Sequence, residues 1–256
     1  MTECITIAVT NQKGGVGKTS TCAALTGIFA GVGKRVLAID LDPQGNLSFS
    51  LGAEDTGKTI HDVMKGDCTI ISAIKHTRVC DVISSNILLS GSDIELTGKD
   101  REFILKNLLA PLKNIYDAII IDTPPALSVL TINAYTAADD LIIPMTPDIL
   151  SLQGIAQLKD TILGVKKYYN KNLNIRGILL TKYNPKYLLS KEAGEMAEIV
   201  AEQLHTEVFD IKIPMNVAVA EAPAHQMTIT EYDPRSKAAK EYTRLARYLY
   251  PEIMEQ

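Results

Sequence analysis

A glycine-rich segment near the N-terminus limits the folds open to this chain more than any other part of its sequence. The apolar run Ile5–Val9 has the length of a strand, and residues 10–19, TNQKGGVGKT, follow it directly. A helix-forming run, Thr19–Ala30, begins where the glycines end. A strand, a glycine-rich turn and a helix in direct succession form the first half of a β-α-β unit. We therefore expect a parallel α/β sheet that begins at the N-terminus.

The rest of the chain repeats this alternation of strand-like and helix-like segments. The predicted strands are Ile5–Val9, Arg35–Ile39, Asn86–Leu89, Asp117–Ile121, Leu141–Met145, Ile175–Leu180 and Val208–Ile213. The main predicted helices are Thr19–Ala30, Arg101–Leu112, Leu152–Tyr169, Lys191–Leu204 and Ser236–Tyr250. Because several strands are almost continuously apolar, the pattern predicts a doubly wound, mostly parallel β-sheet flanked by helices on both faces. We interpret residues 1–256 as a single domain, in which Gly52–Asp81 forms short helices and turns with an N-cap at Thr59.

The composition excludes several classes of protein. The chain has 26 Lys and Arg against 30 Asp and Glu, a net charge of −4, so DNA contact would require a local basic patch. Its four cysteines form no CxxC pair, which is typical of reduced thiols. The N-terminus lacks a signal-peptide pattern, and no apolar run reaches the roughly 18 residues of a membrane span. We therefore expect a cytoplasmic protein without a membrane segment.

The glycine-rich segment has the residue types that bind nucleotide phosphates. Glycines let backbone N–H groups turn toward an anion, and the following helix adds the positive end of its dipole. In this pattern Lys18 reaches the β- and γ-phosphates, and the Thr19 hydroxyl ligates Mg²⁺. The predicted nucleotide-binding residues of this segment are Lys13, Gly14, Gly15, Val16, Gly17, Lys18, Thr19 and Ser20. The standard pattern G-x-x-x-x-G-K-[ST] would place its first glycine at Gln12; the alternative, a glycine turn without a ligand, matches by chance at roughly 10⁻⁷ per position.

Aspartates follow two of the predicted strands. Asp40 and Asp42 follow the strand Arg35–Ile39, and Asp122 follows Asp117–Ile121. Carboxylates at the C-terminal ends of parallel strands point into the crevice where ligands bind. We expect Asp122 to hold Mg²⁺ through a water molecule, and Asp42 to lie at the metal and orient the attacking water. The alternative is that these aspartates only form turns or cap helices, as in most Asp-Pro loops.

The loop carries a second lysine, Lys13, which calls for more negative charge than one bound nucleotide offers. A nucleotide on a facing subunit would supply that charge. The segment K-G-G-V-G-K-T resembles the deviant Walker loop of the ParA/MinD/Soj family of ATPases, in which the early lysine contacts the nucleotide across an ATP-sandwich dimer. The segments D-L-D-P-Q-G-N and D-T-P-P resemble the two switch motifs of that family. The resemblance implies ATP and Mg²⁺ as cofactors, and Lys13, Lys18 and Asp42 as catalytic residues.

Residues 181–184, TKYN, follow a predicted strand where GTPases carry T-K-x-D. The aspartate of that motif accepts hydrogen bonds from guanine, and the uncharged Asn184 in its place favours adenine. Structures of the family place this segment, and the one around Pro214, beside the base. The resemblance therefore implies that Thr181, Asn184 and Pro214 belong to the nucleotide site.

The C-terminal third resembles chromosomal ParA proteins of the Soj type. Residues 213–225, IPMNVAVAEAPAH, resemble their I-P-R-N-V-x-x-x-E-A-P-S-H, and residues 232–239, YDPRSKAA, resemble Y-x-P-x-S-x-G-A. Two positions depart from the pattern. Met215 stands where these proteins commonly carry an arginine implicated in DNA binding, and Ala238 stands where they carry glycine. The resemblance extends from the first strand to near residue 250.

Basic residues gather on one face of the last predicted helix. Lys237, Lys240, Arg244 and Arg247 are spaced by 3, 4 and 3 residues, without an acid among them on that face, and Arg235 precedes them. Such a face could contact DNA phosphates without sequence preference, in a salt-sensitive way. The alternative is an ordinary solvated basic face. With the family resemblance added, we predict DNA contact.

The resemblance implies a DNA-partitioning ATPase that forms a homodimer on binding ATP, binds DNA non-specifically at the nucleoid, and is reset by hydrolysis stimulated by a ParB-like partner. One alternative is a MinD-like membrane-associated positioning ATPase, but residues 250–256, YPEIMEQ, are short, acidic and interrupted by proline. Another is a relative of nitrogenase iron protein, which would need a cysteine after Cys80. A metabolic ligase or synthetase of the same superfamily would have no use for the basic helix.

Overall fold

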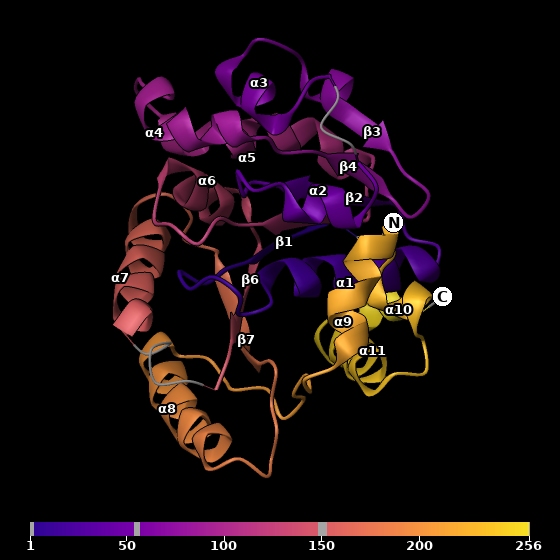
Figure 1. Ribbon diagram of the computed structural model, residues 1–256. Helices are drawn as coiled ribbons and strands as arrows, with labels where there is room; N and C mark the ends of the chain where they lie inside the picture. Colours follow the sequence, from indigo (N-terminus) through magenta and orange to yellow (C-terminus); the bar gives the residue numbers. More distant parts are fainter. Residues whose placement is uncertain (1–2, 54–56, 148–152, 256) are drawn as a thin grey trace.

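The computed structural model describes residues 3–53, 57–147 and 153–255, and its centre is a seven-stranded sheet (Figure 1). The strands are β1 (Ile5–Val9), β2 (Val36–Asp40), β3 (Ile74–His76), β4 (Asp81–Ile83), β5 (Ala118–Asp122), β6 (Asp140–Met145) and β7 (Asn174–Leu180). Their order is β3-β4-β2-β5-β1-β6-β7, and each pair is parallel except the antiparallel pair β3 and β4. The predicted mostly parallel sheet is confirmed.

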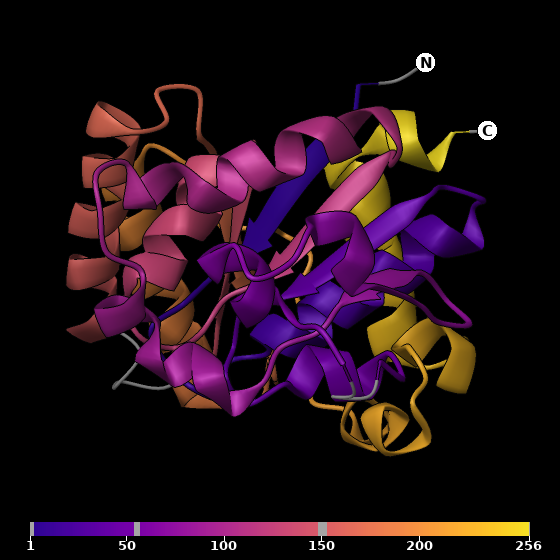
Figure 2. The same ribbon diagram turned by 90° about the horizontal axis from the view of Figure 1, so that it is seen from above.

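Helices cover both faces of this sheet (Figures 1 and 2). They are α1 (Lys18–Gly31), α2 (Asn46–Ser50), α3 (Ile60–Lys65), α4 (Ser92–Glu95), α5 (Ile104–Leu109), α6 (Val129–Ala137), α7 (Gln153–Tyr168), α8 (Leu188–Leu204), α9 (Val217–Glu221), α10 (Ile229–Tyr232), α11 (Lys237–Leu249) and α12 (Pro251–Met254). One hydrophobic core contains side chains of α5 to α8, and a second contains side chains of α1 and α11. The sheet is therefore doubly wound, as predicted.

Side chains of the central strands alternate between the two cores. In β2, Leu37 and Ile39 belong to the core under α5 to α8, whereas Val36 and Ala38 belong to the core under α1 and α11. All four are buried. Because both faces of the strand are covered, a polar residue on either face would lose its contact with water. This explains the continuous apolar runs in the sequence.

Two predicted strands are wrong. Residues 87–91 form a 3₁₀ helix, and the Asn86 side chain caps it by accepting a hydrogen bond from the backbone N–H of Leu88 at 3.1 Å. Ile87 and Leu88 are exposed, and only Leu89 of this apolar run is buried in the core. The strands of this region are β3, inside the segment Gly52–Asp81 that was expected to hold only helices and turns, and its partner β4, which begins at the last residue of that segment. The N-cap at Thr59 is confirmed, with Asp62 completing its capping box.

The predicted strand Val208–Ile213 is an irregular segment beside β7. Its Val208 makes an isolated bridge with Ile178 instead of a continuous ladder, and Pro214, just after the segment, makes a second bridge with Tyr183. The backbone N–H of Phe209 donates to Ile178 O at 3.0 Å, and the Phe209 ring fills the space beside Gly177. A Cβ on Gly177 would lie 2.3 Å from this ring, so the contact requires glycine.

The predicted helix Arg101–Leu112 is divided into two 3₁₀ turns with α5 between them. Its second 3₁₀ turn contains Pro111, which cannot donate a backbone hydrogen bond to continue the helix. Helices α1, α8 and α11 match their predictions within a few residues. The predicted start of α7 at Leu152 lies outside the described residues.

The order of the central strands brings the sequence motifs together. β5 lies between β1 and β2, and the parallel register pairs Val9 with Asp122 and Asp40 with Asp122. The glycine-rich segment leaves the sheet directly after Val9. The loop and the aspartates of both acidic motifs therefore meet at the carboxyl edge of three adjacent strands.

Candidate functional site

The glycine-rich loop runs from the end of β1 to the first turn of α1. Gly15 and Gly17 have φ angles of 73° and 91°, in the left-handed region that favours glycine. Gly14 and Gly15 are exposed, and a Cβ on either would meet no heavy atom within 4 Å. Gly17 is the N-cap of the 14-residue helix α1, which has no side-chain cap. Open backbone and an uncapped helix start are the features of an anion-binding loop.

Hydrogen bonds of Asn11 and Thr181 fix the shape of this loop. The Asn11 side chain donates to Pro144 O at 2.7 Å and accepts from the backbone N–H of Lys13 at 3.0 Å. The Thr181 hydroxyl donates to Val16 O at 2.8 Å. Thr181, predicted in the nucleotide site, thus lies against the loop from the end of β7. Sequence reasoning missed Asn11, because one asparagine before a glycine-rich loop carries no distinctive signal.

Lys18 lies at the base of the loop and is only 6% exposed. Its Nζ donates to Lys13 O at 3.2 Å, which points the amine along the inner side of the loop. Burial lowers the pKa of Lys18, while Asp122 and Asp42 act in the opposite direction. A phosphate group bound in the loop would supply the anion that this buried cation needs.

Thr19 and Asp122 form the part of the site that fits a metal ion. The Thr19 hydroxyl donates to Asp122 Oδ2 at 2.7 Å, while Asp122 Oδ1 is buried without a hydrogen-bond partner in the described structure. Burial raises the pKa of Asp122, and the nearby carboxylate of Asp40 raises it further. A cation would compensate for both effects, so the donors fit Mg²⁺.

No group of three or more His, Cys, Asp or Glu side chains able to hold a metal occurs among the described residues. Mg²⁺ at a nucleotide site commonly takes one or two protein oxygens and completes its shell with water and phosphate.

Asp42 is buried, on the loop that joins β2 to α2. Its Oδ1 accepts a hydrogen bond from the backbone N–H of Gln44 at 3.0 Å. Asp40, two residues earlier, is fully buried; burial raises its pKa, and hydrogen bonds from Ser48 and Asp42 lower it. Asp40 therefore faces α2, whereas Asp42 and Asp122 are the carboxylates whose charges act on Lys18.

Lys13 lies on the outer side of the loop and lines a cavity of about 390 Å³. Gly14 and Gly15 line the same cavity, together with Lys182, Tyr187 and Met215. Lys182 has a φ angle of 50°, a left-handed conformation that few residues with side chains adopt. Two lysines, Lys13 and Lys182, line this cavity, so its opening is favourable for an anion.

The structure brings the two predicted base-binding segments together. The bridge between Tyr183 and Pro214 and the hydrogen bond from Tyr183 N–H to Ile213 O, 3.0 Å long, join them. Asn184 Oδ1 accepts from the backbone N–H of Lys186 at 3.1 Å, so it stabilises its own turn. Asn184 and Pro214 therefore lie in one neighbourhood, at the end of β7.

The basic residues near the C-terminus are all exposed. They are Arg235, Lys237, Lys240, Arg244 and Arg247. The opposite face of α11 is buried against α1, as expected for a core stripe. One detail is corrected: Glu241 lies beside this face, and its carboxylate is 3.4 Å from Arg244 Nη1. The C-terminal segment forms only the four-residue α12, and no described helix is long and apolar enough to span a membrane.

A phosphate-type loop between β1 and α1, with carboxylates at the ends of the adjacent strands, defines a P-loop nucleotide-binding protein. A family model for the AAA domain matches residues 4–175. The chain is 44% identical to the sporulation initiation inhibitor protein Soj of Bacillus subtilis, over 94% of this chain and 96% of that protein. It is 39% identical to the chromosome-partitioning ATPase Soj of Treponema pallidum, over 94% and 95%. The chain belongs to the Soj/ParA family of chromosome-partitioning ATPases.

A solved structure supports the same fold. Cobyrinic acid a,c-diamide synthase from Mycobacterium smegmatis, with bound ADP and magnesium, superposes with a TM-score of 0.82 at 34% identity, covering 97% of this chain and 96% of that one. That structure holds a nucleotide and magnesium in a chain with this architecture. That protein is named as a synthase, which is a different activity from partitioning. The fold by itself therefore does not distinguish the two activities.

Proposed function

We propose that this protein is an ATP-switched DNA-partitioning ATPase, acting as a single domain over residues 1–256 in the cytoplasm at the nucleoid. ATP binding drives formation of a homodimer, the dimer binds DNA without sequence preference, and hydrolysis resets it. A ParB-like partner stimulates the hydrolysis. The observation that carries the proposal is that one loop holds both Lys13, which lines a cavity beside the loop, and Thr19, which forms the metal-type site with Asp122. The first calls for a second subunit, and the second for a metal-bound nucleotide.

Each predicted residue has a role in this proposal. Residues Gly14 to Ser20 hold the phosphates, and Lys18 neutralises the β- and γ-phosphates from below the loop. Thr19 and Asp122 hold Mg²⁺, Asp122 through water, and the metal neutralises charge on the phosphates. Asp42 lies at the metal and orients the attacking water. Lys13 reaches the nucleotide of the partner subunit.

The remaining nucleotide contacts are assigned to the end of β7. Asn184 and Pro214 border the adenine, and Asn184 lacks the carboxylate that guanine recognition requires. Thr181 acts through the loop, because its hydroxyl is committed to Val16 O. The proposed nucleotide is therefore ATP and not GTP.

DNA binding is assigned to the basic side of α11. Four exposed cations form no ion pair with any residue that the structure describes: Arg235, Lys237, Lys240 and Arg247. Arg244 is the fifth member and shares its charge with Glu241. Met215, 71% exposed, offers no charge where relatives commonly carry arginine, so α11 supplies the main electrostatic contact.

A metabolic synthetase is the second candidate, because a synthase of 34% identity shares the fold. It predicts turnover that depends on a small metabolite and ignores DNA. The relatives named as partitioning proteins cover nearly the whole chain at higher identity, which favours the first candidate.

One experiment separates these functions. Gel filtration and retention on DNA are compared with ADP and with ATP, using the full chain and its Asp42→Ala variant, which is expected to block hydrolysis. A dimer that is retained on DNA only with ATP supports the proposal. A variant that stays monomeric and ignores DNA in ATP would overturn it.

A further inference from the structure

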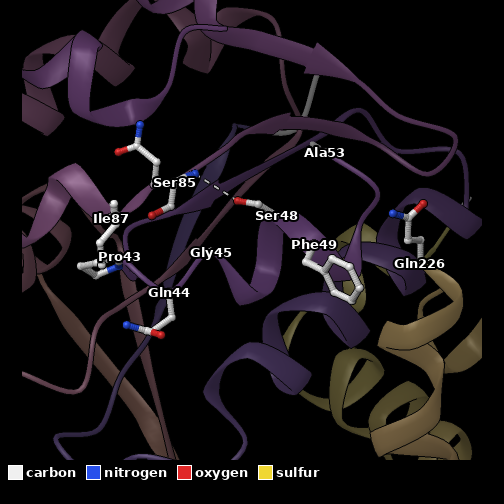
Figure 3. Close-up of a pocket in the computed structure, with 10 residues that line it drawn as sticks. Pro43, Gln44, Gly45, Ser48, Phe49, Ala53, Ser85, Ile87 and Gln226 are labelled. Carbon is white, nitrogen blue, oxygen red and sulfur yellow. Dashed lines mark hydrogen bonds between the residues drawn. The ribbon is translucent and has the colours of Figure 1, made fainter. Parts of the chain in front are cut away.

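A ring of hydrogen bonds encloses the backbone of Asp42. Asp40 Oδ1 accepts from the N–H of Asp42 at 3.1 Å, and Asp40 Oδ2 accepts from both the N–H and the hydroxyl of Ser48 at 2.8 Å. The N–H of Ser85 donates to Ser48 Oγ at 3.0 Å, and the Ser85 hydroxyl donates to Asp42 O. Both polar backbone groups of Asp42 are thereby fixed. Figure 3 shows the bond between Ser85 and Ser48.

The ring connects three separate parts of the fold. Asp40 ends β2, Ser48 lies in the middle of α2, and Ser85 follows β4, the neighbour of β2 in the sheet. All three side chains are buried. The Ser48 hydroxyl both donates and accepts within the ring, a combination that alanine cannot replace. The ring therefore ties the Asp42 loop to the rigid sheet on one side and to α2 on the other.

Packing alone does not hold this loop. Pro43, Gln44 and Gly45 line a cavity of about 390 Å³, and Ser48 and Ser85 line the same cavity (Figure 3). Side chains of a packed core would hold a loop by contact on all sides. Here the residues that follow Asp42 border open space, so the hydrogen bonds of the ring determine their position.

We propose that Asp40, Ser48 and Ser85 are positioning residues for ATP hydrolysis. They fix the backbone of Asp42, and so fix the place of its carboxylate relative to the phosphate loop. This inference rests on the proposed function, in which Asp42 orients the attacking water. Such an orientation must hold to within about 0.5 Å, which a loop beside a cavity does not achieve unaided. None of the three residues belongs to the phosphate loop, and neither serine carries a charge, so variants of Ser48 and Ser85 should keep their affinity for nucleotide.

The test uses Ser48→Ala and Ser85→Ala in the full chain, with Ser50→Ala as the matched control. Ser50 is also buried and also on α2, but its hydroxyl donates to Asn46 O and stays outside the ring. Three quantities are measured: kcat and KM for ATP, the equilibrium affinity for ATP, and hydrogen exchange of the Gln44 and Gly45 amides. These two amides donate to Asp42 itself, so their exchange reports the order of the loop without any turnover.

We expect Ser48→Ala and Ser85→Ala each to lower kcat about tenfold, the effect of losing one buried hydrogen bond at a catalytic group. KM and ATP affinity should stay close to wild type, the melting temperature should fall by a few degrees because a buried polar group loses its partner, and the two amides should exchange faster. Ser50→Ala should change neither kcat nor exchange. Ser48→Thr restores the hydroxyl and should recover most of kcat. If one alanine variant fails to fold, the kcat and amide exchange of the other alone test whether the ring positions Asp42.

Two results would overturn the inference while leaving the proposed function standing. One is a wild-type kcat in both alanine variants. The other is an equal loss of kcat and ATP affinity, which would mark the serines as structural supports of the whole site. A wild-type chain that hydrolyses no ATP, alone or with DNA and a partitioning partner, would instead overturn the proposed function.

Discussion

The Thr19 hydroxyl lies 2.7 Å from Asp122 Oδ2, although 103 residues separate the two side chains in sequence. The bond joins the first turn of α1 to the end of β5, and it leaves the other carboxylate oxygen of Asp122 buried and unpartnered in the described structure. A buried carboxylate in this state is destabilised in its charged form. Its compensation by a metal ion is the basis of the first prediction.

Thr19→Val should remove the effect of magnesium on nucleotide affinity. Valine keeps the shape of threonine and loses only the hydroxyl, so we expect the affinity for Mg-ATP to fall about tenfold, to the value measured in excess EDTA. Fluorescence titration of a nucleotide analogue measures this. Thr26→Val, in the same helix, is the control, because the buried Thr26 hydroxyl has no described partner. An unchanged magnesium effect in Thr19→Val would contradict the prediction.

Lys13→Ala should abolish the ATP-dependent dimer and spare ADP binding. The lysine lines the outer cavity, while Lys18, on the inner side of the loop, remains to hold the phosphates. Light scattering with ATP and with ADP measures the oligomeric state. Lys106→Ala, an exposed lysine on α5, removes the same charge elsewhere and should dimerise normally. Normal dimerisation of Lys13→Ala would refute the second-subunit role.

Removing Lys240 and Arg247 together should weaken DNA binding equally for all DNA sequences. Each phosphate contact contributes about 0.9 to the slope of log affinity against log salt, so the slope should fall by about 2. The control is the double alanine variant of Lys166 and Lys167 at the end of α7, which changes net charge by the same amount. Fluorescence anisotropy over a range of salt concentrations measures the slope for each double variant. Equal slopes would place DNA binding elsewhere.

Gly177→Ala should destabilise the fold by about 1–3 kcal/mol, because the new Cβ overlaps a buried ring. It would lie 2.3 Å from Phe209 Cε1 and 2.9 Å from Glu207 O. Urea denaturation measures the free energy of unfolding. Gly164→Ala in α7 meets no heavy atom within 4 Å and should be neutral or stabilising. If both variants have wild-type stability, the close approach of Phe209 to β7 is wrong.

Stability should decrease as the pH rises above about 9, partly because of two cysteines. Burial raises the pKa of the Cys4 thiol to about 11 and that of Cys80 to about 12, from 9.0. Between pH 9.0 and the raised pKa values, the folded state keeps thiol protons that the unfolded state releases. The free energy of unfolding therefore falls as the pH rises through this range. The double alanine variant of Cys4 and Cys80 should show a smaller decrease between pH 8 and pH 10. An identical decrease would contradict the raised pKa values.

The sequence predicted the parts of the fold where burial leaves little choice. β1 begins and ends as predicted, and β5 to β7 shift by only a residue or so, because strands covered on both faces must be continuously apolar. β3 and β4 have three residues each, too few for a periodic pattern. The predicted strand Asn86–Leu89 was wrong because Ile87 and Leu88 are exposed, which the sequence alone does not reveal.

The candidate site also contains residues that the sequence predicted and residues that it did not. The loop, Thr19 and Asp122 were predictable because their chemistry demands fixed residue types at fixed spacing. The supports of the site, such as Asn11 and Ser85, were not. Their partners lie far away in the chain, and asparagine or serine in a loop has many other uses. Thr181 shows the same limit: its place after β7 was predictable, but its bond to Val16 was not.

The register that aligns Val9, Asp40 and Asp122 at one edge of the sheet has a consequence for synthesis of the chain. A nascent chain that has emerged only as far as α5 already carries the complete phosphate loop but lacks Asp122. It also lacks β5, the strand that separates β1 from β2. In the proposed function, nucleotide capture with a metal would therefore begin only after the middle of the sheet has closed. From then on, bound nucleotide would stabilise the closed sheet by mass action, so the ligand would favour only chains whose sheet is complete.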